Sequence, residues 1–174
     1  MELKKTALYY LHKKFDAKFV QFAGYEMPIQ YKNGVISEHN ITRQKSGIFD
    51  VSHMGQLFIR GDKTLTIKLQ NIFPTDLENL PINHSKYSFL MNENGGIYDD
   101  LIITKIKDGY MIILNAACKE KDFKIIKSKL DNTFITILRD DLSLIAIQGP
   151  ESKDVLEPIV PGVSNLKFMS GNEF

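Results

Sequence analysis

Two adjacent carboxylates follow a glycine pair at the start of an apolar run. Two residues separate Gly96 from Asp99 and Asp100, and Leu101 follows directly. Since successive residues of a strand face opposite sides, the two carboxylates should point in opposite directions. One can line an apolar pocket, where it could bind a cation, accept a heterocycle N–H or act as a general base. We expect Asp99 to take that place and Asp100 to be structural. A turn-capping Asp99 is the alternative that the residues alone leave open.

A second group of reactive residue types lies in the segment 50–54. Asp50, Ser52 and His53 are the residue types of a hydrolytic triad. Because neighbouring residues of an extended chain diverge, their contiguity argues against a triad, and we interpret His53 as a structural residue. Met54 follows, and could offer an adaptable apolar surface to a flat ligand or pack in the core.

Asn115 and Cys118 follow the predicted strand 110–114 and precede a predicted helix. Asn115 either caps that helix or presents its amide to a ligand at the strand end. Cys118 has no partner thiol, which predicts a buried, inert cysteine. No metal site and no phosphate-binding glycine loop is predicted, since metal-ligand spacing is lacking among Cys118 and the four histidines, His12, His39, His53 and His84.

The composition limits the class of protein. The chain has 174 residues, of which 43% are hydrophobic and 25% charged, with a net charge of +1. These values are typical of a globular protein with one sizeable core, and the near-neutral charge gives no support for nucleic-acid or membrane binding. The single cysteine and the lack of an apolar leader predict a cytoplasmic location.

The helices and strands that the sequence predicts around these residues indicate an α+β fold. Helical spacing predicts helices over residues 4–14 and 35–45, and aromatics interrupted by Gly and Pro predict a β-like wall over 19–31. The order from residue 55 onward is β-α-β-β-β-α-β-β, which is an elaborated ferredoxin-like (split βαβ) arrangement. Its expected strands span 56–60, 86–92, 97–106, 110–114, 134–138 and 142–147, and its helices 62–72 and 119–130.

Five sequence blocks, in order, resemble the aminomethyltransferase (T-protein) family of the glycine cleavage system. Each block resembles a segment of that family; a single block would be weak, but five in order over nearly the whole chain are strong. Folate-dependent paralogues share the same fold, so the resemblance is less specific for the activity than for the family. The blocks are FAGYEMPIQY at 22–31, Arg43 with GIFDVSHM at 47–54, GGIYDDLI at 95–102, NAACKEKD at 115–122 and IQGP at 147–150.

The resemblance implies a site and a reaction. It places Asp99 in a tetrahydrofolate pocket as the catalytic carboxylate, with folate contacts from Met54, Tyr87, Leu101 and Asn115. The implied substrate is an aminomethyl group on the lipoyl arm of the partner H-protein, and the implied products are ammonia and methylene-tetrahydrofolate. An anionic Asp99 would stabilise the developing cation and orient the folate nitrogens.

The resemblance also implies an incomplete ring of three folate-binding domains, since family members are about twice this length. We expect residues 1–54 to be the N-terminal part of the first domain, 55–142 the ferredoxin-like domain, and 143–174 a return into the first domain that stops short. A truncated or split enzyme is one interpretation. The alternatives are a folate-binding paralogue of the demethylase or iron–sulfur maturation type, and a non-catalytic remnant.

Overall fold

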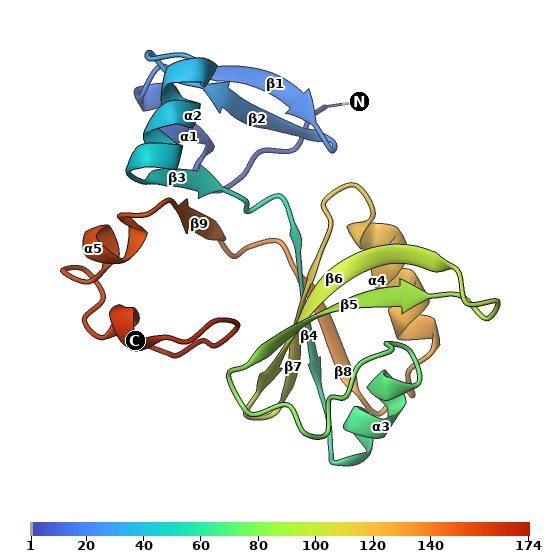
Figure 1. The fold of residues 1–174 in the computed structure, drawn as a ribbon. Helices are drawn as coiled ribbons and strands as arrows, with labels where there is room; N and C mark the ends of the chain where they lie inside the picture. The colour runs from blue at the N-terminus through green and yellow to red at the C-terminus, as the bar shows by residue number, and fades with distance from the viewer. Residues whose placement is uncertain (1) are drawn as a thin grey trace. The chain divides into compact units, whose positions relative to one another are not determined.

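The computed structural model describes residues 2–174, which form two compact units of mixed α/β structure with antiparallel sheets (Figure 1). The first unit contains the chain up to His53, together with Asp141–Leu166 and Phe174. The second contains Met54–Asp140 and Lys167–Glu173. Within residues 2–174, no helix has both the length and the apolar character needed to cross a membrane.

The first unit is built from two small sheets and short helices. Strands β1 and β2 form a hairpin whose turn residues, Ala23 and Gly24, both have positive φ (49° and 82°), as the commonest two-residue hairpin turns require. Strand β3 pairs antiparallel with β9, so a segment from late in the chain completes this unit. The elements are α1 (Tyr9–Lys14), β1 (Lys18–Phe22), β2 (Tyr25–Gln30), α2 (Val35–Gln44), β3 (Gly47–Asp50), β9 (Ile145–Gln148), α5 (Ser152–Leu156) and a 3-10 turn (Val163–Asn165).

The first helix begins later than its sequence pattern predicts. The pattern placed its start at Lys4, whereas α1 begins at Tyr9. Lys4 instead forms a parallel β-bridge with Tyr25, in which its N–H donates to the Gly24 carbonyl at 3.0 Å and its carbonyl accepts from Glu26 at 2.9 Å. A backbone committed to that bridge cannot also form the first helical turn.

The second unit contains a five-stranded antiparallel sheet in the order β5-β6-β7-β4-β8. Strand β4 lies between β7 and β8, which α4 connects, and this is the split βαβ arrangement expected from the sequence. The predicted strand 142–147 is not part of this sheet, because β9 pairs with β3 in the first unit. The elements are β4 (Gly55–Arg60), α3 (Thr64–Gln70), β5 (Ser85–Met91), β6 (Ile97–Ile106), β7 (Gly109–Leu114), α4 (Lys119–Ser128) and β8 (Ile135–Arg139).

The two faces of the sheet differ in what covers them. One face, which we call the core face, packs with α3 and α4 in a single apolar cluster that includes Leu57, Ile103 and Ile112. The alternate residues of the same strands form the opposite face, which we call the open face. The open face carries apolar side chains that the unit leaves exposed: Tyr87, Ile102, Ile135 and Ile137.

The C-terminal segment is divided between the two units. Residues 143–174 were expected to return to the first domain as one piece, but Lys167–Glu173 belong to the second unit. The reason is backbone pairing next to β5. The Ser85 N–H donates to the Met169 carbonyl at 2.8 Å, and the Gly171 N–H donates to Asn83 at 2.6 Å.

Candidate functional site

The register of the β5–β6 hairpin decides where the two carboxylates point. Asp99 is paired with Leu90 and Asp100 with Phe89, and cross-strand partners share a face of a sheet. Leu90 is fully buried in the cluster beneath the core face. Asp99 therefore lies on the core face and Asp100 on the open face. The prediction that the two diverge is confirmed. That Asp99 is the carboxylate of the site stays a prediction.

Asp100 is joined to an exposed aromatic residue on the open face. The Tyr87 hydroxyl donates a hydrogen bond to Asp100, and this bond to a carboxylate raises the pKa of Tyr87. Tyr87 is 56% exposed, and its ring meets Phe89 edge-on with 5.2 Å between centroids. An exposed ring beside a carboxylate suits a flat, hydrogen-bonding ligand. The predicted ligand contact of Tyr87 stays a prediction.

Asn115 holds both carboxylates from the end of β7. Its Nδ2 donates to Asp99 Oδ1 at 2.9 Å, and to the carbonyl and Oδ1 of Asp100, both at 3.1 Å. Helix α4 has no side-chain cap, so of the two roles left open for Asn115 the capping role is excluded. Its amide instead fixes the orientation of the Asp99–Asp100 pair.

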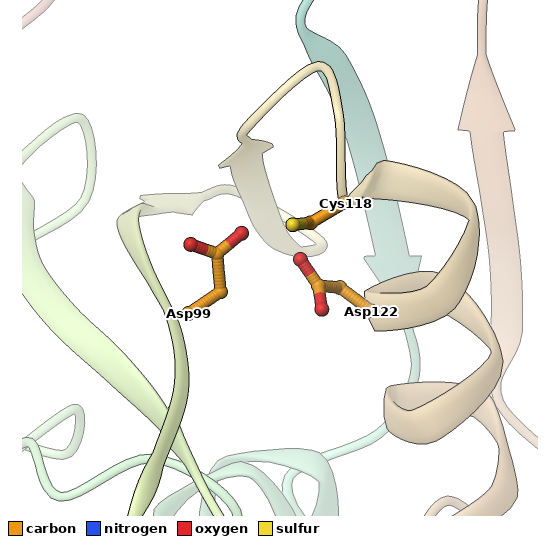
Figure 2. Close-up of side chains that lie close together, drawn as sticks. All are labelled: Asp99, Cys118 and Asp122. Atoms are coloured by element: carbon orange, nitrogen blue, oxygen red, sulfur yellow. The ribbon is translucent and has the colours of Figure 1, made fainter. Parts of the chain in front are cut away.

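Asp99 faces α4 and lies beside a second acid. Figure 2 shows its carboxylate directed toward Cys118 and Asp122, which come from the beginning of α4. Burial acts to raise the pKa of Asp99, but hydrogen bonds from Asn115 and Asp122 and the Asp100 N–H hold it below the usual value. Burial and the neighbouring Asp99 raise the pKa of Asp122 to about 7. Two carboxylates this close favour one proton between them.

Two other predicted ligand contacts occupy different environments. Leu101 is only 3% exposed and its side chain is part of the core cluster, so its predicted contact with a ligand stays a prediction. Its place follows from alternation, since Leu101 shares the face of Asp99 and Ile103. Met54 is half-buried and lies directly before β4, at the start of the second unit.

The residues of the apparent triad do not come together as one. Asp50 binds Thr6 Oγ1 at 2.7 Å, His12 Nε2 at 2.8 Å and the Ser52 N–H at 3.0 Å. Burial acts to raise the pKa of Asp50, but the bonds from His12, Ser52 and Thr6 outweigh it and lower this pKa. His53 packs edge-on against Phe22 with 5.5 Å between ring centroids, in keeping with a structural role.

Two polar groupings were missed by the sequence analysis. In the first unit, His12 joins Asp50 to the Tyr31 hydroxyl, which lies 2.7 Å from its Nδ1. In the second, Asp99, Cys118 and Asp122 form a cluster. Positions 118 and 122 are one helical turn apart, and this spacing could have indicated that Cys118 and Asp122 lie together. Asp99 and His12 reach their partners through tertiary structure, so no local sequence pattern indicates them.

Comparisons with known proteins agree over nearly the whole chain. The model of the GCVT N-terminal domain matches residues 8–174. The mitochondrial aminomethyltransferase of Dictyostelium discoideum is 45% identical over 97% of this chain and 44% of its own length. The probable mitochondrial aminomethyltransferase of Schizosaccharomyces pombe is 47% identical over 95% and 44%. A crystal structure of glycine cleavage system aminomethyltransferase T from Bartonella henselae superposes with a TM-score of 0.91 at 38% identity, covering 98% of this chain and 47% of that one. The chain thus spans less than half the length of these relatives.

Proposed function

The chain belongs to the GCVT N-terminal domain family, and we propose that it is the N-terminal part of a tetrahydrofolate-dependent aminomethyltransferase of the glycine cleavage system. The reaction releases ammonia from the aminomethyl-lipoyl arm of the H-protein and forms methylene-tetrahydrofolate. The support is the similarity to named aminomethyltransferases at 38–47% identity over 90% or more of this chain.

The observation that carries the proposal is the Tyr87–Asp100 pair on the open face. A reduced pterin is flat and presents several N–H groups, so it needs an aromatic or apolar surface and a hydrogen-bond acceptor. Tyr87 and Ile102 supply the first, and the Asp100 carboxylate supplies the second. We therefore propose Asp100, in place of Asp99, as the carboxylate that faces the folate.

The role of Asp100 follows from its charge and its supports. Tetrahydrofolate, when bound, supplies the nitrogens that accept the one-carbon unit. Asp100 would stabilise the positive charge that develops when ammonia leaves, and would take up a proton released from a folate nitrogen. Asn115, which donates to Asp100 Oδ1 and to Asp99, fixes the carboxylate before the reaction and lowers the cost of reorganising it. Asp99 acts on this site through Asn115 and through the Asp100 N–H, which donates to Asp99 Oδ1 at 3.0 Å.

The open face also indicates that more protein belongs over it. Apolar side chains such as Ile135 and Ile137, at 57% and 42% exposure, form with Ile102 and Tyr87 an apolar surface of the kind that another domain or a ligand covers. We propose that the part of the sequence present in the relatives but not in this chain completes the folate site. Tetrahydrofolate and the lipoylated H-protein are the proposed substrate and partner.

We propose that the protein resides in a reducing compartment. Cys118 is a free thiol, as a reducing compartment such as the cytoplasm favours. The relatives include mitochondrial proteins, so the proposal is a reducing compartment in either location.

The test is reconstitution. This chain is mixed with a polypeptide covering the remaining half of a relative, and tetrahydrofolate binding is measured by calorimetry, followed by ammonia release from aminomethylated H-protein. We expect binding and turnover by the mixture, with each half alone binding weakly or not at all. Failure of a stable, folded mixture to bind tetrahydrofolate would refute the enzymatic function for this chain.

A further inference from the structure

The first unit buries few apolar side chains. Among residues 2–174, its buried apolar side chains are Tyr9, Tyr25 and Met27, whereas the second unit has the continuous cluster beneath the core face. Strands β3 and β9 form a sheet of only two strands, so in the described part of the chain each has one edge without a strand partner, which we call a free edge. A two-stranded sheet is at best marginally stable by itself. The first unit therefore lacks the apolar core that a stable domain needs.

An apolar groove in the same unit, which we call the α1 groove, lies between α1 and the β3–β9 sheet. Its volume is about 720 Å³, and its lining includes Leu11 and Phe15 from α1, Ile48 from β3 and Ile145 from β9. Each of these four side chains is 47% or more exposed. Ile48 and Asp50 alternate onto one face of the sheet, which the cross-strand partner of Asp50, Ile145, shares. Large apolar side chains from separate elements thus converge on one groove that they do not fill.

Hydrogen bonds fix the polar part of this lining. The side chains of His12 and Asp50, which both line the groove, are 9% and 1% exposed. Asp50 accepts from Thr6 and pairs with His12, whose other ring nitrogen contacts the Tyr31 hydroxyl. Because these polar groups satisfy one another, the groove keeps its shape and calls for no polar ligand. Its apolar walls are what remain uncovered, and they favour an apolar occupant.

We propose that a free edge of the β3–β9 sheet and the α1 groove receive a β-strand from the part of the relatives' sequence that this chain lacks. The chain matches 44% of the Dictyostelium discoideum relative, so more than half of that protein lies outside the match. A strand added to a free edge forms main-chain hydrogen bonds, and its alternate apolar side chains enter the groove beside Ile48. The first unit thus completes its core by binding this segment. The inference rests on the partial match to the family and requires neither tetrahydrofolate nor aminomethyltransferase activity.

Amide hydrogen exchange tests the strand addition directly. This chain is measured alone and mixed with a polypeptide covering the remaining part of the Dictyostelium discoideum relative, without tetrahydrofolate or H-protein. We expect the amides of β3 and β9 to exchange about tenfold or more slowly in the mixture, because the added strand protects them. The amides of β4, which has a strand on each side within the second unit, serve as the control and should change little. Failure of the two polypeptides to associate, or a complex in which β3 and β9 exchange as in the chain alone, would overturn the proposal.

Matched variants locate the binding surface. Ile48→Asp places a charge in the α1 groove and should weaken association of the two polypeptides, measured by calorimetry, by about tenfold or more. Ile67→Asp is the control, since Ile67 is similarly exposed (64% against 67%) but lies on α3 of the second unit, and it should leave the affinity unchanged.

Ile48→Thr keeps the β-branched shape and should have an intermediate effect, which guards against misfolding of Ile48→Asp; circular dichroism checks each variant. Equal affinity of the Ile48 and Ile67 variants would overturn the proposal. A complex that shows the expected exchange and variant effects but binds no tetrahydrofolate would refute the proposed enzymatic function and support this inference.

Discussion

The two faces of strand β6 place neighbouring carboxylates in opposite physical situations. On the open face, the half-buried Asp100 pairs with an exposed tyrosine. On the core face, Asp99 lies next to another acid beneath α4. One residue step along a strand therefore gives two half-buried carboxylates different partners.

The role of each carboxylate depends on what packs against the face of the sheet that carries it. Asn115 contacts both aspartates, so the two are coupled even though they face apart. Substitutions on the two faces should consequently have different primary effects, stability for the core face and ligand binding or transfer for the open face.

The largest effect on stability is expected from adjacent apolar residues on the two faces. Leu101→Ala should lower the free energy of unfolding by about 2–5 kcal/mol, because it opens a cavity in the core cluster. Ile102→Ala, one residue further on the open face, should cost no more than about 1 kcal/mol in this chain. Urea unfolding followed by circular dichroism measures both. Equal losses would mean that the faces are not distinct.

A smaller effect is expected from pH, measured in metal-free buffer. The pKa of Asp122 is raised in the fold, so the folded state holds a proton that the unfolded state releases. Its contribution to stability should be lost as pH rises from about 4 through about 7, by up to roughly 4 kcal/mol, and Asp122→Asn should remove this dependence.

Asp50 in the first unit provides the control of opposite sign. Its pKa is lowered by the bonds from His12, Ser52 and Thr6, so its contribution is present above the ordinary aspartate pKa and is lost as pH falls through the lowered value. Asp50→Asn should remove that acid-side loss and leave the dependence near neutral pH unchanged. A chain whose stability does not fall between pH 5 and 8, a range set by the raised pKa of Asp122, would contradict the buried acid pair.

The smallest expected effect tests the open face alone. Tyr87→Ala should weaken tetrahydrofolate binding by the reconstituted protein by about threefold to tenfold, since it removes an aromatic surface. Tyr87→Phe keeps the ring and should bind nearly as well, which separates stacking from the hydrogen bond to Asp100. Unchanged affinity in Tyr87→Ala would show that the folate does not contact this part of the sheet.

Much of the fold followed from the sequence because its causes are local. Glycine and asparagine at 92–96 predicted the turn between β5 and β6, and helical spacing predicted α2 and α4. The start of α1 was missed because a bridge between Lys4 and Tyr25, distant in sequence, replaces the first helical turn. Helix and turn signals operate over a few residues, whereas such bridges do not.

The sequence could not predict which face of the sheet carries Asp99 and which carries Asp100, for a related reason. A register shift between Leu90 and Met91 inserts an irregularity into the hairpin, and a shift of one residue exchanges the faces of every side chain beyond it. Alternation could establish that Asp99 and Asp100 diverge, but not which of them shares the face of Tyr87. The burial of Leu101 follows from the same register.

The measurement that tests the central claim most directly compares Asp99→Asn with Asp100→Asn in the reconstituted aminomethyltransferase. Both substitutions remove one charge and keep the side-chain shape, so each serves as the control for the other. Asp100→Asn should lower the rate of methylene transfer by about 10²–10³-fold at unchanged stability, because it removes the charge facing the folate. Asp99→Asn should lower the rate by no more than about tenfold and change mainly the stability, because it acts through Asn115. A loss in Asp99→Asn that equals or exceeds the loss in Asp100→Asn, with both variants folded, would contradict the assignment of the open face as the site.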